Sequence, residues 1–134
     1  MALTIYTDGG SRNNPGDAGI GVVAYRDSEK VFELSEFLGT CTNNWAEYQG
    51  VIRALETVLA HGLHTEPILV RMDSKLVVEQ LSGAWKVKEP SLKPQYERAR
   101  TLIQSCTSVT LVHIPREQNK EADFLANQAM DRGV

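Results

Sequence analysis

The sequence predicts a mixed α/β fold, in which one β-sheet of five strands carries helices on both of its faces. Two observations support this class. Three alternating apolar segments come first and are typical of consecutive antiparallel strands, and helical and strand patterns then alternate to the end of the chain. The predicted order of elements is βββαβααβα. Because 134 residues are enough for one hydrophobic core, we expect a single domain over residues 1–134.

The first three strands are expected at residues 3–8, 18–25 and 31–38. Short polar turns separate them, at residues 13–16 (Asn-Asn-Pro-Gly) and 27–30 (Asp-Ser-Glu-Lys). Turn-forming residues between short alternating segments are typical of an antiparallel meander.

The second half of the chain alternates helices with strands. A helix is expected from residue 44 to residue 61, since its apolar side chains follow helical spacing and Gly62 lies where helices usually end. Next come a strand at 68–72, a helix at 74–81, a loop at 83–94, a helix near 95–105, a strand at 108–114 and a helix from about 119 to 132. The strand at 68–72 is apolar apart from Arg71 and lies between helices, a pattern typical of parallel pairing.

Composition limits the classes of partner. The net charge of −3 argues against a protein that coats nucleic acid by charge alone, although it leaves room for a local basic edge. The negative charge of carboxylates gathered into a metal site would be offset in part by the bound cations.

No apolar run is long enough to cross a membrane and there is no secretory signal, so we expect a cytoplasmic protein without membrane contact. Cys41 and Cys106 are in neither CxxC nor CxxH spacing, which favours thiols over a metal site, although the two could pair.

Four carboxylates lie beside apolar segments. Asp8 and Asp73 each end a predicted strand, and if those strands are parallel neighbours both side chains reach the same edge of the sheet. Glu47 lies at the flank of the apolar stripe of the first predicted helix, and Asp123 adjoins the stripe of the last helix. Each acid also has a purely structural interpretation, as a turn residue, a helix cap, a helix-dipole partner or a solvated side chain. Together they favour a paired or metal-binding set, because carboxylates otherwise avoid buried positions.

Four segments around these acids resemble type 1 ribonuclease H. They are TDGG at residues 7–10, TNNWAEYQGVIRAL at 42–55, MDSKLVVEQL at 72–81 and HIPREQNKEADFLAN at 113–127. The resemblance runs from about residue 3 to residue 130, in the family's order of strands and helices. It implies a ribonuclease H-like fold, cleavage of the RNA strand of an RNA/DNA hybrid, and a catalytic set made of Asp8, Glu47, Asp73 and Asp123.

The implied chemistry needs divalent cations. Hard oxygen ligands suit Mg²⁺, with Mn²⁺ as a substitute, and two such ions about 4 Å apart activate a water and stabilise the leaving oxygen. In the family's pattern Asp8 bridges both ions, Glu47 and Asp73 bind one, and Asp123 helps to hold the other. On this interpretation the first strand ends at Asp8 because the metals lie there, and the two glycines after it let a backbone come close.

Selectivity for RNA requires a contact to the 2′-hydroxyl, which both donates and accepts hydrogen bonds. Amide side chains serve both roles. By resemblance, Asn14, Asn43 and Asn44 line the minor groove of the hybrid, and Thr42 meets a phosphate of the DNA strand. Alternatives stay open, since Asn14 before Pro-Gly is ordinary turn chemistry and Asn44 alone could cap the following helix.

The segment before the last acid departs from the family's pattern. Many members have a flexible-loop histidine there that helps the product to leave. His113 has similar spacing but falls in a predicted strand, which would hold its ring away from the metals. Arg116 or Glu117 would then serve instead.

The loop at residues 83–94 is a second departure, because many members have a basic helix and loop there that grip the DNA strand. What remains of this handle is one aromatic side chain among lysines: Trp85, Lys86, Lys88 and Lys93. Such a combination suits nucleic acid. The alternative is a solvated loop with Trp85 packed on the core.

We therefore expect a monomeric, metal-dependent endoribonuclease that hydrolyses the RNA strand of RNA/DNA hybrids. One alternative is a non-catalytic hybrid-binding or protein-interaction module of the same fold, which the intact set of four acids disfavours. Another is a nuclease of the same fold with a different substrate, such as a 3′ exonuclease or a junction resolvase. The amide-rich loops near the acids favour the hybrid.

Overall fold

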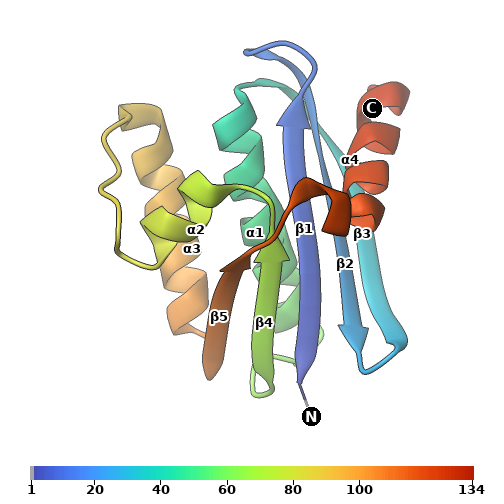
Figure 1. Ribbon diagram of the computed structural model, residues 1–134, viewed down its shortest axis with the longest axis vertical. Helices are drawn as coiled ribbons and strands as arrows, with labels where there is room; N and C mark the ends of the chain where they lie inside the picture. Colours follow the sequence, from blue (N-terminus) through green and yellow to red (C-terminus); the bar gives the residue numbers. More distant parts are fainter. Residues whose placement is uncertain (1) are drawn as a thin grey trace.

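The structure, a computed structural model, describes residues 2–134 and has the predicted order of strands and helices (Figure 1). Its strands are β1 Leu3–Ser11, β2 Gly16–Arg26, β3 Glu29–Cys41, β4 Pro67–Met72 and β5 Ser108–His113. Its helices are α1 Asn43–Ala60, α2 Lys75–Leu81, α3 Lys93–Gln104 and α4 Lys120–Arg132. Two short 3-10 helices, η1 Pro90–Leu92 and η2 Arg116–Gln118, precede α3 and α4.

The five strands form one mixed sheet in the order β3-β2-β1-β4-β5. β2 pairs antiparallel with both β1 and β3, so the predicted meander is confirmed. β4 pairs parallel with both β1 and β5, as predicted for a buried strand between helices. The carboxyl ends of three parallel strands therefore lie at one end of the sheet, where open α/β sheets bind their ligands.

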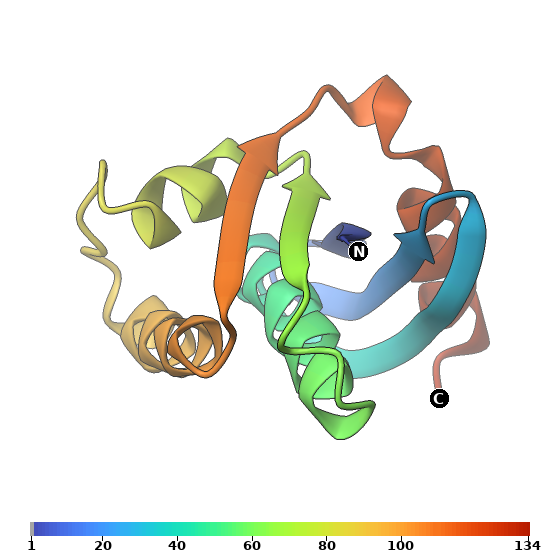
Figure 2. The same ribbon diagram turned by 90° about the horizontal axis from the view of Figure 1, so that it is seen from below.

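Helices cover both faces of this sheet, with α1 and α3 on one side and α4 on the other (Figure 2). Beneath α1 the core includes fully buried side chains from strands and helix alike: Ile5, Val70, Tyr48 and Val51. Tyr48 also donates a buried hydrogen bond of 2.6 Å to Gln80 Oε1, which links α1 to α2. Each large apolar side chain that is buried contributes roughly 1.5–3 kcal/mol, so packing holds these layers together more than helix propensity does.

Side-chain caps begin α1 and α2, two of the helices that lie beside predicted acids. The Thr42 hydroxyl accepts a hydrogen bond of 3.3 Å from the Trp45 N–H at the start of α1. Ser74 caps α2 in the same way, through the Val77 N–H. These caps set where each helix starts, and the start of α1 carries Glu47.

β1 continues past Asp8 to Ser11, which lies opposite Ala18 of β2. The prediction that the strand ends at Asp8 is therefore wrong. On its other side β1 loses its neighbour earlier, since its last pair with β4 joins Thr7 to Met72. Asp8 thus emerges where β4 stops, while pairing with β2 keeps the backbone extended.

Two further predictions concern the chain as a whole. Among residues 2–134, no helix is both long and apolar enough to span a bilayer. Cys41 and Cys106 are free thiols, as predicted. The cytoplasmic location stays a prediction.

Candidate active site

Three carboxylates meet at the end of the sheet where β4 stops. Asp8 belongs to β1, Asp73 directly follows β4, and Glu47 lies near the start of α1. One carboxylate oxygen from each lies within 4.8 Å of the other two. The structure therefore brings together three acids that the sequence predicted from separate segments.

The close approach of α1 to β1 depends on Gly9. A Cβ atom at this position would lie 2.2 Å from the Ala46 carbonyl oxygen and 2.8 Å from the Glu47 nitrogen, far inside normal contact distance. Only glycine therefore lets the start of α1 lie against β1. The sequence predicted that a backbone segment would lie close to the glycines after Asp8, and this segment is the start of α1. The contact places Glu47 near Asp8.

α4 approaches the opposite face of the sheet through Gly21 of β2, where a Cβ atom would lie 2.0 Å from the Ala122 carbonyl oxygen. Gly21 lies directly opposite Asp8, and opposite residues of an antiparallel pair share a face, so Asp8 faces the side that carries α4. Asp123 lines the same cleft as Asp8. Arg116 Nη2 lies 3.7 Å from Asp123 Oδ1, so the fourth predicted acid joins the cluster with a cation beside it.

The cluster is unfavourable without a bound cation. Burial, with the charges of Asp73 and Asp123 in addition, raises the pKa of Asp8 to about 8. Burial also raises the pKa of Glu47 well above its usual value, and Asp8 and Asp73 add to this effect. Asp8 is 8% exposed and Glu47 7%, and within the described chain Glu47 Oε2 is buried without a hydrogen-bond partner. Clustered oxygens that include an unpaired buried one fit a divalent cation, which takes oxygen ligands.

A buried asparagine holds the segment that carries Asp123. Asn119 is 1% exposed, and its Nδ2–H donates a hydrogen bond of 2.8 Å to the Thr7 carbonyl. The backbone carbonyl of Asn119 accepts a hydrogen bond of 3.1 Å from the backbone N–H of Asp123. Asn119 thus ties the start of α4 to the residue before Asp8. Sequence reasoning missed it, because an asparagine at the start of a predicted helix indicates an ordinary cap, and here the side chain makes no cap bond.

The acids line an open cleft of about 620 Å³. His113 lies at the edge of this cleft. That its strand holds the ring away from the metals stays a prediction. His113 is the last residue of β5, as the predicted strand requires, and lies level with Met72. Arg116 and Glu117 also line the cleft, and the Arg116 side chain is 78% exposed.

Two of the three predicted amide side chains, Asn14 and Asn43, accept hydrogen bonds from backbone N–H groups. The Asn43 N–H donates to Asn14 Oδ1 at 3.0 Å, and the Ser11 N–H donates to Asn43 Oδ1 at 3.3 Å. Asn14 therefore connects its own turn to the first residue of α1. Asn44 is exposed in the first turn of α1, and the prediction that it could cap this helix alone is wrong because Thr42 is the cap.

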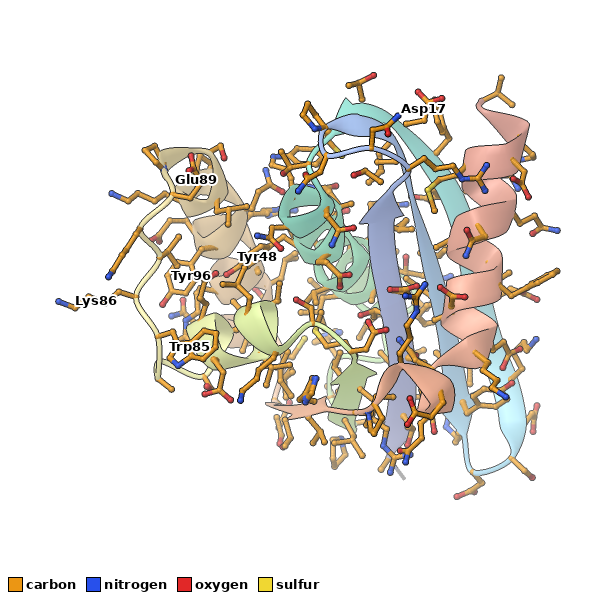
Figure 3. All side chains as sticks on the ribbon, turned by 45° about the horizontal axis from the view of Figure 1, so that its top comes forward. Asp17, Tyr48, Trp85, Lys86, Glu89 and Tyr96 are labelled. Carbon is orange, nitrogen blue, oxygen red and sulfur yellow. The ribbon has the colours of Figure 1, made fainter. Side chains whose placement is uncertain are left out.

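The loop between α2 and α3 displays Trp85 and several lysines (Figure 3). Trp85 is 45% exposed, with Lys75 Nζ lying 6.0 Å from its ring centre. The alternative in which Trp85 packs into the core is therefore wrong. Lys86 points away from the body of the protein in Figure 3, and Lys88 and Lys93 are exposed as well.

Comparison with known proteins agrees with this geometry. The family described as "Reverse transcriptase-like" matches residues 6–129. The solved structure of LC11-RNase H1, a protein isolated from compost by a metagenomic approach, contains an RNA/DNA hybrid. It is 45% identical to this chain, has a TM-score of 0.92 and matches over 97% of each chain. The chain belongs to the ribonuclease H family. Its ribonuclease H fold confirms the predicted fold class.

Two other proteins similar to this ribonuclease H chain are longer. Ribonuclease HI of Halobacterium salinarum is 42% identical over 127 residues, which cover 94% of this chain and 63% of that protein. The Bifunctional protein Rv2228c of Mycobacterium tuberculosis is 44% identical over 133 residues, which cover 98% of this chain and 36% of that protein. The chain thus spans between about a third and two thirds of the length of these relatives.

Proposed function

We propose that the protein is a metal-dependent endoribonuclease that hydrolyses the RNA strand of RNA/DNA hybrids. The observation that carries this proposal is the set of Asp8, Glu47 and Asp73, which brings three oxygens within 4.8 Å at the end of the parallel strands. LC11-RNase H1, which contains an RNA/DNA hybrid in its solved structure, supports the choice of substrate. A non-catalytic module of the same fold would have no use for buried carboxylates that oppose one another's ionisation.

Mg²⁺, or Mn²⁺ in its place, is the proposed cofactor, with two ions for each site. Glu47 and Asp73 would hold one ion, Asp123 would help to hold the second, and Asp8 would bridge the two. When bound, such ions supply an activated water and stabilise the leaving 3′ oxygen. Their positive charge would also offset the repulsion from Asp73 and Asp123, which adds to the effect of burial on the pKa of Asp8 in the metal-free protein.

Asn14, Asn43 and Asn44 are the proposed contacts to the RNA strand. Asn14 Oδ1 and Asn43 Oδ1 each accept a backbone hydrogen bond, so the amide N–H groups are left to face a ligand. An amide N–H donates to the 2′-oxygen that RNA has and DNA lacks. The hydrogen bonds also fix both side chains in advance, which lowers the entropy cost of binding.

The DNA strand would lie over Thr42 and the loop that holds Trp85. The Thr42 hydroxyl oxygen accepts the cap bond of α1, so its proton remains free to donate to a phosphate. Lys86 and Lys88 add positive charge in an otherwise acidic protein. The exposed ring of Trp85 offers a flat surface for stacking.

Release of the cleaved strand is assigned to His113 and Arg116. Both line the cleft, from the end of β5 and from η2 respectively. Each offers N–H donors that attract the new terminal phosphate. Arg116 also lies beside Asp123, so it reaches the edge of the acidic cluster.

Labelled RNA/DNA, RNA/RNA and DNA/DNA duplexes of one sequence provide the test, each incubated with Mg²⁺, with Mn²⁺ and with EDTA. The proposal predicts internal cuts in the RNA strand of the hybrid, and no cuts in EDTA. Cleavage only from a 3′ end would support an exonuclease instead. Binding of the hybrid without cleavage in either metal would support a non-catalytic module.

A further inference from the structure

A second hollow lies on the same face of the sheet as the catalytic cleft. It has a volume of about 540 Å³ and is lined by β1, by parts of β2 and β4, and by residues 117–121. Its walls include Tyr6, Tyr25, Arg71 and Lys120. The proposed hydrolysis uses none of these side chains.

The crossing segment, residues 114–119, runs across the sheet from β5 to α4 (Figure 1). Its first residues line the cleft and its last residues line the hollow. Glu117 lines both spaces. The Asn119 amide donates to the Thr7 carbonyl and so attaches the crossing segment to β1 between them. Alternate residues of a strand point to one face, so Tyr6 and Asp8 share this face at a spacing of roughly 7 Å. The hollow and the cleft are therefore direct neighbours.

Arg71 gives the hollow a cation without an acidic partner. Its guanidinium lies 5.6 Å from the centre of the Tyr6 ring and donates a hydrogen bond of 2.7 Å to the Tyr6 hydroxyl. Among residues 2–134, no carboxylate lies within ion-pairing distance of Arg71 or of Lys120. Arg26 and Arg53, which are also half-buried, each pair with a glutamate. Most of the five N–H donors of Arg71 thus remain available to a ligand.

The remaining walls offer acceptors. Glu121 is already engaged, by the Tyr25 hydroxyl at 2.5 Å and by Lys30 at 2.9 Å. Asp27 and Glu117 also line the hollow, and neither has a cationic partner in the part of the chain that the structure describes. A lining of free cations and free carboxylates suits a ligand that combines a phosphate with hydroxyl groups better than it suits a simple anion.

We propose that this hollow binds one unpaired nucleotide. Arg71 and Lys120 hold its phosphate, because a guanidinium fork matches phosphate oxygens. Asp27 or Glu117 accepts a ribose hydroxyl, and the Tyr25 ring lies against the base. The nucleotide is a free mononucleotide or the unpaired end of an RNA strand whose paired part occupies the cleft. The second source rests on the proposed function.

Adenosine monophosphate, titrated into the metal-free protein, tests the site without catalysis. In ¹⁵N NMR spectra the backbone amides of Tyr6, Tyr25 and Arg71 should shift, while that of Glu47 should not. Arg71→Met keeps an apolar stem and removes the donors, so it should weaken binding roughly tenfold. Arg98→Met, on exposed α3, is the matched control and should bind as the wild type does. Lys120→Met repeats the test in case Arg71→Met does not fold.

Hybrid substrates separate the two sources of the nucleotide. For the wild type, a hybrid with a few unpaired ribonucleotides at one end should have a KM several-fold lower than a blunt hybrid. Arg71→Met should remove this difference and still cleave the blunt hybrid. Binding of adenosine monophosphate without an effect of the unpaired end would assign the hollow to a free nucleotide.

Two results would overturn the proposal. One is an absence of nucleotide binding by the wild type together with equal KM values for the two hybrids. The other is a set of NMR shifts confined to the catalytic cleft. Failure to cleave any hybrid would contradict the proposed function alone, because the titration with adenosine monophosphate does not depend on catalysis.

Discussion

The position of Asp8 among other acids lowers the free energy of unfolding of the metal-free protein by an amount that depends on pH. Its pKa is about 8 in the metal-free folded protein, because it is buried and lies beside Asp73 and Asp123. In the unfolded chain the same carboxyl is solvated, with a pKa of about 3.9. The folded protein therefore binds this proton more tightly than the unfolded chain does. Below about pH 4 the carboxyl is protonated in both states and does not change the stability. Between about pH 4 and 8 the protein loses stability as the pH rises, and above about pH 8 the loss is constant.

We expect Asp8→Asn to stabilise the metal-free protein, because the amide removes the charge at almost the same size. The gain should be near zero at pH 4 and roughly 0.5–2 kcal/mol at pH 8. Urea unfolding in EDTA at several pH values measures it. Asp17→Asn, at an exposed position, is the matched control and should follow the wild type. A constant difference between Asp8→Asn and the wild type across this pH range would contradict the account.

Cation binding should be linked to the same proton. Since a metal binds the ionised carboxylate, Mg²⁺ has to displace the proton that Asp8 retains below about pH 8. We expect the apparent affinity for Mg²⁺ to rise with pH up to about 8, and binding at pH 7 to release protons. Calorimetry in two buffers with different ionisation enthalpies measures the number released. Binding without proton release at pH 7 would argue that Asp8 is already ionised.

Asn119 is expected to position Asp123 rather than to touch the substrate. Asn119→Asp replaces the donor to the Thr7 carbonyl with an acceptor, which should cost roughly 1–3 kcal/mol of stability. The half-saturating Mg²⁺ concentration should rise and kcat should fall, while KM for the hybrid changes little. Gln104→Glu, an exposed amide on α3, is the control. A less stable Asn119→Asp variant with an unchanged half-saturating Mg²⁺ concentration would show that Asn119 supports the fold and does not position Asp123.

At the scale of elements, the loop between α2 and α3 is proposed to hold the DNA strand. Each lost contact between a lysine and a phosphate should flatten the dependence of log affinity on log salt by about one unit. We expect this for Lys86→Ala and Lys88→Ala, measured by hybrid binding in the inactive Asp8→Asn background. Lys30→Ala, in the hairpin at the far end of the sheet, should leave the slope unchanged (Figure 1). Equal slopes for all variants would show that the loop is ordinary solvated surface.

The order of strands and helices could be predicted because each element carries its own periodic pattern. The end of β1 could not be predicted in this way, because its length depends on pairing with β2. Gly9 and the residue after it look like a turn in sequence, yet the backbone there stays in the ladder as far as Ser11.

The predicted acids meet because glycines let two helices lie against the sheet. Sequence indicated Asp8, Glu47 and Asp73 through their places beside apolar segments, and the structure brings them within one site. Asn119 could not be found in this way. Its role depends on a hydrogen bond to Thr7, 112 residues away in sequence, and local patterns carry no information about such a contact.

At the scale of the whole molecule, the proposed function requires a chain with a net charge of −3 to bind a polyanion. Four of its acids lie in the proposed catalytic cluster, where bound divalent cations would offset their charge. Exposed lysines in the loop between α2 and α3 add a local basic edge. Affinity for the hybrid should therefore depend on both metal and salt. The expected monomeric state stays a prediction.

Cleavage of a labelled RNA/DNA hybrid by two matched variants tests the central claim most directly. Glu47→Gln removes one charge from the catalytic cluster, whereas Glu29→Gln makes the same chemical change in the hairpin between β2 and β3. With Mg²⁺ present and both variants folded, Glu47→Gln should lower kcat roughly 100-fold or more. Glu29→Gln should cleave the RNA strand at the wild-type rate. Wild-type cleavage by Glu47→Gln would contradict the assignment of this carboxylate cluster as the catalytic site.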